Sequence, residues 1–333
     1  MNIGFNKIYT GLSISPSCVN AVQLQNNKTG WELLRWAHHP FSQDKPQYSF
    51  RNTNTSDCKK LAAAISEVME PMDLKNSVIG LALPNEVIKV SIKAHKNLPQ
   101  TDAKIADMIA WEMEKALQLS HASLRISCYR PEPSSKDTPS RLLAAIGVDA
   151  VLNEYESLCS ELNLEIRTVA PAAICQLNFY SDLLPSSGVI AFSGLFENFF
   201  TLFIIENGQI EFYQGIKKRL DKNYYLNDID RALQFYSQEN HGKHIETLYI
   251  GSQVGDSAKL QPLSDRFEGI EVVIPDELRL IDLHVNCQQF VQKPGLNAFS
   301  TAIGAAQSLA PVKTAALDTL KMWAAKIKNT GTQ

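Results

Sequence analysis

The chain has 333 residues, of which 44% are apolar and 20% are charged, so it can bury a large core and divide into two lobes. Its net charge of −3 provides no basic surface for nucleic acid, and no apolar run approaches the roughly 20 residues that cross a bilayer. Residues 1–7 are short and polar, so we expect no secretory signal, and six scattered cysteines without a C-x-x-C pair indicate free thiols in a reducing cytoplasm.

The first 84 residues predict three antiparallel strands, a helix and a further strand. Asn and Gly at 26–30 supply the turn between the second and third strands, and the apolar run at 78–84 is typical of a strand covered on both faces. The expected strands cover 8–14, 19–25, 31–38 and 78–84, and the helix covers 56–69. His38 and His39 come at the end of the third strand and precede Pro40, so we place them in a surface loop. Adjacent residues of a strand point to opposite faces and rarely share one metal, so we expect no metal site there.

Residues 85–165 alternate short strand and helix patterns, which predicts a small α/β subdomain that is inserted into the first lobe. Proline- and serine-rich loops separate its elements. The expected strands cover 87–92, 124–130 and 142–148, and the expected helices cover 105–117 and 150–162.

The rest of the chain predicts the end of the first lobe, a second lobe and two closing helices. Glu206-Asn207-Gly208 is the strongest local turn signal. We assign residues 1–84 and 166–186 to the first lobe, 187–298 to the second lobe, 299–312 to a helix that returns to the first lobe, and 313–333 to an amphipathic tail.

The two lobes open with the same strand–turn–strand unit. Ser13 in the first unit and Ser193 in the second lie 193 − 13 = 180 residues apart. In phosphate-binding versions of this unit the turn carries an Asp and a Gly, which orient water and admit backbone amides to the phosphates. Here the corresponding positions hold Ser13, Ser15, Ser193 and Leu195. The lack of carboxylates indicates binding or assembly rather than turnover, and we assign no catalytic residue and no metal site.

Three motifs follow one another along the chain. Leu81-Ala82-Leu83-Pro84-Asn85-Glu86 ends a strand, Trp111-Glu112-Met113-Glu114-Lys115 lies on a helix, and Ala302-Ile303-Gly304-Ala305-Ala306 lies in the closing helix. In this order the chain resembles the PilM family and the shorter HofM-type proteins. PilM is an actin-like, cytoplasmic, membrane-associated component of type IV pilus assembly and is related to FtsA. The resemblance implies an α/β fold of the actin-like (ribonuclease H-like) class, with two lobes and an inserted subdomain.

The resemblance also locates the nucleotide site and shows that its motifs are degenerate. The family's two Asp-containing phosphate motifs become Gly11-Leu12-Ser13-Ile14-Ser15 and Phe192-Ser193-Gly194-Leu195. Loss of a positioned base typically lowers a rate by about 10²–10⁴-fold. ATP with Mg²⁺ remains an open cofactor, bound weakly if at all. Its expected contacts are Ser13, Ser15, Ser17, Ser193, Gly194, Gly251 and Ser252.

For partners, the resemblance implies an adaptor in a type IV pilus or type II secretion-like platform, cytoplasmic and peripheral at the inner membrane. PilM-type proteins hold the N-terminal tail of the inner-membrane protein PilN in a groove beside the inserted subdomain, and other pilus assembly proteins are further expected partners. Trp111 borders this groove or lies in the core. The expected groove residues are Val87, Ile88, Val90, Met108, Ile109 and Trp111. A nucleotide-gated ATPase and a polymerising scaffold are the alternatives.

The last 21 residues form an apolar stripe with lysines beside it, which is typical of an amphipathic helix. Such a helix either docks on its own domain or lies on a membrane surface. In the second case Leu320, Trp323 and Ile327 would face the membrane.

Overall fold

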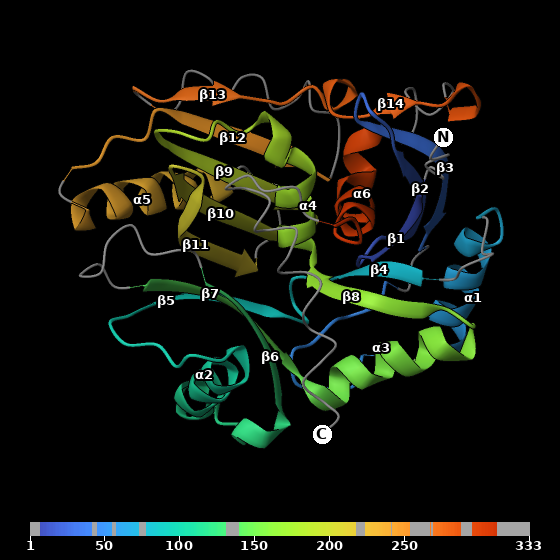
Figure 1. Ribbon diagram of the computed structural model, residues 1–333, viewed down its shortest axis with the longest axis horizontal. Helices are drawn as coiled ribbons and strands as arrows, with labels where there is room; N and C mark the ends of the chain where they lie inside the picture. The colour runs from blue at the N-terminus through green and yellow to red at the C-terminus, as the bar shows by residue number, and fades with distance from the viewer. Residues whose placement is uncertain are drawn as a thin grey trace, which may run out of the picture.

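The computed structural model places two large sheets on either side of a central helix pair, with a smaller sheet below them (Figure 1). Helices α4 and α6 pack against each other between the two large sheets, so the two lobes share this helix pair. The described residues are 7–41, 45–54, 58–72, 78–130, 140–217, 224–240, 242–253, 267, 269–287 and 295–311.

The first lobe is built on a six-stranded sheet of order β14-β3-β2-β1-β4-β8. The meander β1–β2–β3 is antiparallel, while β4 and β8 continue the sheet in parallel from β1. Helices α1 and α3 contact each other beside this sheet, and α6 packs against β1 and β4. The elements are β1 (Ile8–Ile14), β2 (Cys18–Asn26), β3 (Trp31–Pro40), α1 (Cys58–Met69), β4 (Val78–Leu83), α3 (Asp149–Glu161), β8 (Glu165–Pro171) and β14 (Asp282–Leu283).

The second lobe repeats this plan with the order β11-β10-β9-β12-β13. Strands β9 and β10 are buried on both faces, and their apolar side chains pack against Leu226, Ile229 and Leu233 of α5. The elements are β9 (Val189–Phe196), β10 (Phe199–Glu206), β11 (Gln209–Lys217), α5 (Tyr224–Glu239), β12 (Thr247–Ser252) and β13 (Glu271–Val273).

The inserted subdomain lies between β4 and α3 and consists of a three-stranded sheet, β5-β7-β6, with helix α2. Its bounds are β5 (Lys89–His95), α2 (Asp102–Leu117), β6 (Leu124–Tyr129) and β7 (Ser140–Val148). Thr101 caps α2 through its side chain, and Gln118 ends the helix in the left-handed conformation. Arg141 ties the subdomain to the second lobe through an ion pair with Glu211 (Nε–Oε2 2.6 Å).

The central helices α4 (Ala172–Tyr180) and α6 (Ser300–Gln307) approach their neighbours so closely that glycine is required. A Cβ added at Gly304 would lie 1.8 Å from the Cys175 carbonyl oxygen of α4. A Cβ at Gly11 of β1 would lie 2.0 Å from the Ala302 carbonyl oxygen of α6. The small residues of α6 therefore let the backbone of this helix touch both α4 and the first sheet.

A chain segment at the top of Figure 1 connects the two sheets a second time. It adds β13 to the second sheet and then, after a 3-10 turn at Glu277–Arg279, adds β14 to the first. The Tyr180 hydroxyl of α4 donates to Glu277 on this segment at 2.9 Å. We call residues 271–283 the strap.

The predicted α/β fold with two lobes and an inserted subdomain is confirmed. The surface loop predicted for His38 and His39 is wrong, because β3 stays paired with β2 as far as Pro40. Strand β5 begins at Lys89 and runs to His95, later than expected. Among the described residues, no helix is long and apolar enough to cross a membrane. The predicted tail helix, with Leu320, Trp323 and Ile327, lies outside the described residues.

Candidate functional site

A cavity of about 530 Å³ lies between the lobes, where the β1–β2 turn faces the β9–β10 turn. We call it the interlobe cavity. It is the place at which the duplicated units meet, so it corresponds to the nucleotide site expected from the sequence. Its polar lining includes Ser15, Ser17, His38, Lys45, Glu86 and Glu197.

The first turn closes on the side chain of Ser15. The Ser15 Oγ accepts the N–H groups of Cys18 (3.0 Å) and Ser17 (3.3 Å) and donates to the Cys18 carbonyl (2.9 Å). The Ser15 N–H donates to the same carbonyl at 2.9 Å, and Pro16 has no N–H. Every N–H of residues 15–18 is thus committed within the turn, so none is available to hold a phosphate.

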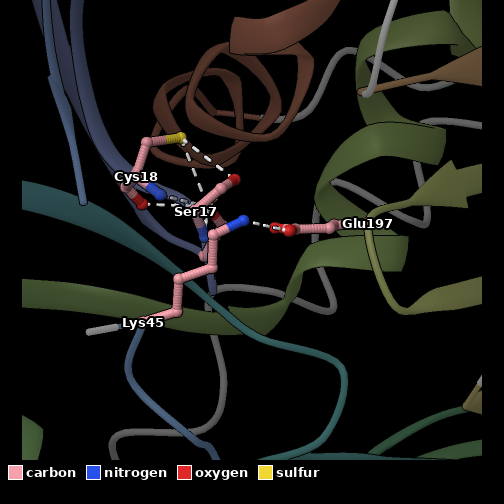
Figure 2. Close-up of polar contacts among 5 residues, drawn as sticks. Ser17, Cys18, Lys45 and Glu197 are labelled. Carbon is pink, nitrogen blue, oxygen red and sulfur yellow. Dashed lines mark hydrogen bonds and ion pairs between the residues drawn. The ribbon is translucent and has the colours of Figure 1, made fainter. Parts of the chain in front are cut away.

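The second turn carries a carboxylate. Glu197 and Asn198 connect β9 to β10, and Lys45 from the first lobe forms an ion pair with Glu197 Oε1 (Figure 2). The other carboxylate oxygen, Oε2, is buried and has no hydrogen-bond partner among the described residues. The lobes are therefore joined across the cavity by an ion pair that uses only one of the two Glu197 oxygens.

A hydrogen-bonded chain fixes the state of His38. The Asn20 Nδ2 donates to the Ala298 carbonyl at 2.8 Å, which turns its Oδ1 toward His38 Nδ1 at 2.6 Å. The Nδ1 is therefore the protonated nitrogen and Nε2 carries the lone pair. Burial lowers the pKa of His38, which favours this neutral form. His38 is among the residues that line the interlobe cavity.

These residues do not fit Mg-ATP. A triphosphate needs donors and cations, whereas the first turn offers no free N–H and Lys45 already pairs with Glu197. A γ-phosphate beside the second turn would meet the Glu197 carboxylate, and like charges repel. Within the described ranges, no three His, Cys, Asp or Glu side chains cluster as metal ligands would.

A second cavity, of about 640 Å³, lies between the inserted subdomain and the second lobe. Strands β5 and β11, each the last strand of its sheet in the described part of the chain, lie side by side along it. The loop after β3 contributes Tyr48 and Phe50. We call this cavity the edge-strand slot. Further lining residues are Ile88, Val90, Tyr213 and Lys217.

The nucleotide contacts predicted from sequence separate into two groups. Ser15 and Ser17 line the interlobe cavity. The others, Ser13, Ser193, Gly194, Gly251 and Ser252, are buried in strands β1, β9 and β12 and are not among the cavity's lining residues. The hydroxyls of Ser13 and Ser193 are buried without a hydrogen-bond partner among the described residues.

The predicted groove residues also separate. Ile88 and Val90 line the edge-strand slot. Val87 and Ile109 are fully buried in the core, and Met108 is half-buried against it. Trp111 is 60% exposed on α2 and stacks on His121 with ring centroids 3.7 Å apart, outside the lining of both cavities.

The charged residues of the two cavities were not singled out by the sequence. Glu197 sits in a two-residue turn between apolar strands, which was the one local signal available. Lys45 and Glu197 are 152 residues apart, and Glu86 follows the Pro84 strand end without a pattern of its own.

No protein-family model matches the chain, and no curated protein matches its sequence. A chain of the PilM–PilN type IV pilus biogenesis complex is similar in structure, with a TM-score of 0.70 at 14% identity over 90% of this chain and 97% of that chain.

Two further solved structures are less similar. One is the cytoplasmic domain of EpsL, an inner-membrane component of the type II secretion system of Vibrio cholerae, with a TM-score of 0.48 at 8% identity over 84% of this chain and 90% of that one. The other is a Bacteroides thetaiotaomicron protein with an actin-like ATPase fold, with a TM-score of 0.48 at 8% identity over 83% and 95%. The chain therefore shares the fold of a chain in the PilM–PilN complex, which confirms the two-lobe α/β fold that the resemblance implied.

Proposed function

We propose that this chain is an adaptor of a type IV pilus assembly platform and binds the N-terminal tail of a PilN-like inner-membrane protein in the edge-strand slot. The observation that supports this most directly is the slot itself, which lies between two strands that each have a free edge. The shared fold with a chain of the PilM–PilN complex supports the identity of the partner.

An extended peptide suits this slot for a physical reason. An edge strand leaves alternate backbone N–H and C=O groups unpaired, and an added strand pairs with them. β5 and β11 each have one neighbour in their sheets, so a bound peptide can gain main-chain hydrogen bonds from the free edge of one of them. The apolar side chains of Ile88, Val90 and Tyr213 then provide pockets for alternate side chains of the peptide.

In this proposal the chain binds its partner without hydrolysing nucleotide, and it is held at the inner surface of the membrane by the tail. The polar groups of the interlobe cavity support this, because they do not fit Mg-ATP. Calorimetric titration with Mg-ATP should give no heat up to millimolar ligand. Micromolar binding would favour a nucleotide-gated switch, and concentration-dependent sedimentation would favour a polymerising scaffold.

The test of tail binding is a titration of the chain with a labelled peptide that covers the N-terminal residues of the PilN-like protein, followed by fluorescence anisotropy. Val90→Arg places a long charged side chain in the slot and should weaken binding at least about tenfold. Ala116→Arg, at an exposed position of α2, adds the same charge to the same subdomain and should leave the affinity unchanged.

Saturable binding that both variants preserve would place the tail elsewhere on the molecule. Trp111→Ala then tests the alternative that the tail crosses α2, where this side chain is exposed. If the wild-type chain does not bind the peptide at all, the proposed function fails.

A further inference from the structure

The interlobe cavity and the edge-strand slot adjoin at Asn85, Glu86 and Phe199, which line both, and we call the two cavities together the channel. The Asn85 side-chain oxygen already accepts the Ala173 N–H at 2.8 Å, and Phe199 is apolar. The group at the junction that can still bind a charged ligand is therefore the carboxylate of Glu86.

Charge changes sign along this channel. The slot presents Lys89 and Lys217, whereas the region beyond the junction presents Glu86 and Glu197. Lys45 also lines the interlobe cavity, but it is paired with Oε1 of Glu197. A cationic group that enters from the slot is thus repelled by the lysines and attracted by the two carboxylates behind them.

Two side chains beyond the junction are relevant to a bound cation. Glu197 Oε2 is buried without a hydrogen-bond partner among the described residues, and His38, whose Nδ1 donates to Asn20 Oδ1, lines the same cavity. Burial raises the pKa of Glu86, and Glu197 raises it further, while Lys217 lowers it. A bound cation that donates hydrogen bonds would offset the cost of burying these carboxylates.

An ammonium group has the required chemistry, since it carries a positive charge and three N–H donors. If the bound peptide lies in the slot with its amino terminus toward the interlobe cavity, its terminal ammonium group reaches the junction at Glu86. We propose that the free α-ammonium group of the partner's tail binds Glu86, with Glu197 as the second carboxylate, so that the tail runs from the interlobe cavity outward past Lys89 and Lys217. This inference rests on the proposed function and adds the direction of the tail to it.

The experiment compares the same N-terminal peptide with a free and with an acetylated amino terminus, since acetylation removes the charge and keeps the sequence. On the wild-type chain acetylation should weaken binding about tenfold or more. On Glu86→Gln the free peptide should bind as weakly as the acetylated one, so that acetylation no longer matters. Glu165→Gln, at an exposed position outside the channel, should retain the wild-type preference.

Equal affinity of both peptides for the wild-type chain would overturn the ammonium site while the proposed function stands. An equal loss of both peptides on Glu86→Gln, in a variant with wild-type thermal unfolding, would also overturn it, because Glu86 would then only shape the slot. Absence of binding by either peptide would overturn the proposed function and this inference together.

Discussion

The β1–β2 turn and the β9–β10 turn occupy the same place in two sheets whose strand orders match apart from β14, yet they are built differently. In the first turn the N–H groups of Ser17 and Cys18 donate to Ser15 Oγ, and the turn carries no charged side chain. The second turn carries Glu197, which pairs with Lys45 through Oε1, while its Oε2 has no hydrogen-bond partner among the described residues. Two turns at equivalent places in the two lobes can thus differ in their hydrogen bonds and charge while the sheets and the central helices around them keep the same plan.

The largest effect is expected where the two lobes share an element. Gly304→Ala places a Cβ 1.8 Å from the Cys175 carbonyl oxygen, and backbone on both sides must move. We expect a loss of about 3 kcal/mol or more in the free energy of unfolding, measured in urea. Gly147→Ala is the control, because the nearest atoms belong to the flexible side chain of Leu152. Equal losses in the two variants would show that α4 and α6 can separate.

Within the first turn, Ser15→Ala should cost about 2 kcal/mol of unfolding free energy, since it leaves the N–H groups of Ser17 and Cys18 without their acceptor. Ser17→Ala removes a half-exposed hydroxyl of the same turn and should cost less than about 0.5 kcal/mol. Chemical denaturation of both variants measures the difference. A turn that closes without the Ser15 hydroxyl would give similar values for both.

Across the two turns, a double-mutant cycle with Lys45→Met and Glu197→Gln measures the ion pair between the lobes. The side chains are 46% and 24% exposed, so we expect a coupling of about 1 kcal/mol that decreases at high salt. Additive losses would mean that the ion pair does not join the lobes in solution.

The smallest effect concerns pH. Burial raises the pKa of Glu86, Glu211 and Glu277 above 4.5, so the folded chain keeps these protons to higher pH than the unfolded chain does. Their contribution to stability is therefore complete below pH 4.5 and is lost as the pH rises through the folded pKa values. Glu86→Gln should make this decrease shallower in denaturation curves recorded between pH 4 and 7. An unchanged slope would contradict the burial of this carboxylate.

Much of the fold could be predicted from sequence because burial leaves a periodic pattern. Strands β9 and β10 are buried on both faces and are read from the sequence as continuous apolar runs, and α5 shows one apolar stripe. β14 could not be predicted, because two residues carry no period and their pairing with β3 depends on the tertiary structure. His38 was assigned to a loop since the following proline suggested a strand end, but Pro40 still pairs with Cys18.

Less of the site could be predicted. The absence of Asp from the two units is visible in the sequence, and it directs attention to the two turns, which the structure places beside one cavity. The ion pair of Lys45 with Glu197 and the position of Glu86 between two cavities arise only when distant segments meet. Hydrogen bonds such as those of Ser15 depend on turn geometry, which residue types alone do not determine.

The strap has a consequence for how the chain is made. The first sheet receives β14 from residues 282–283 and is covered by α6 from residues 300–307, although its first strand begins at residue 8. A ribosome must therefore release nearly all of the described chain before the N-terminal lobe can be completed. Contacts of such long sequence separation fold slowly, and a nascent chain with unpaired strand edges is prone to aggregate. Synthesis of this protein thus exposes an unfinished first sheet to the chaperones of the cell for most of the time of translation.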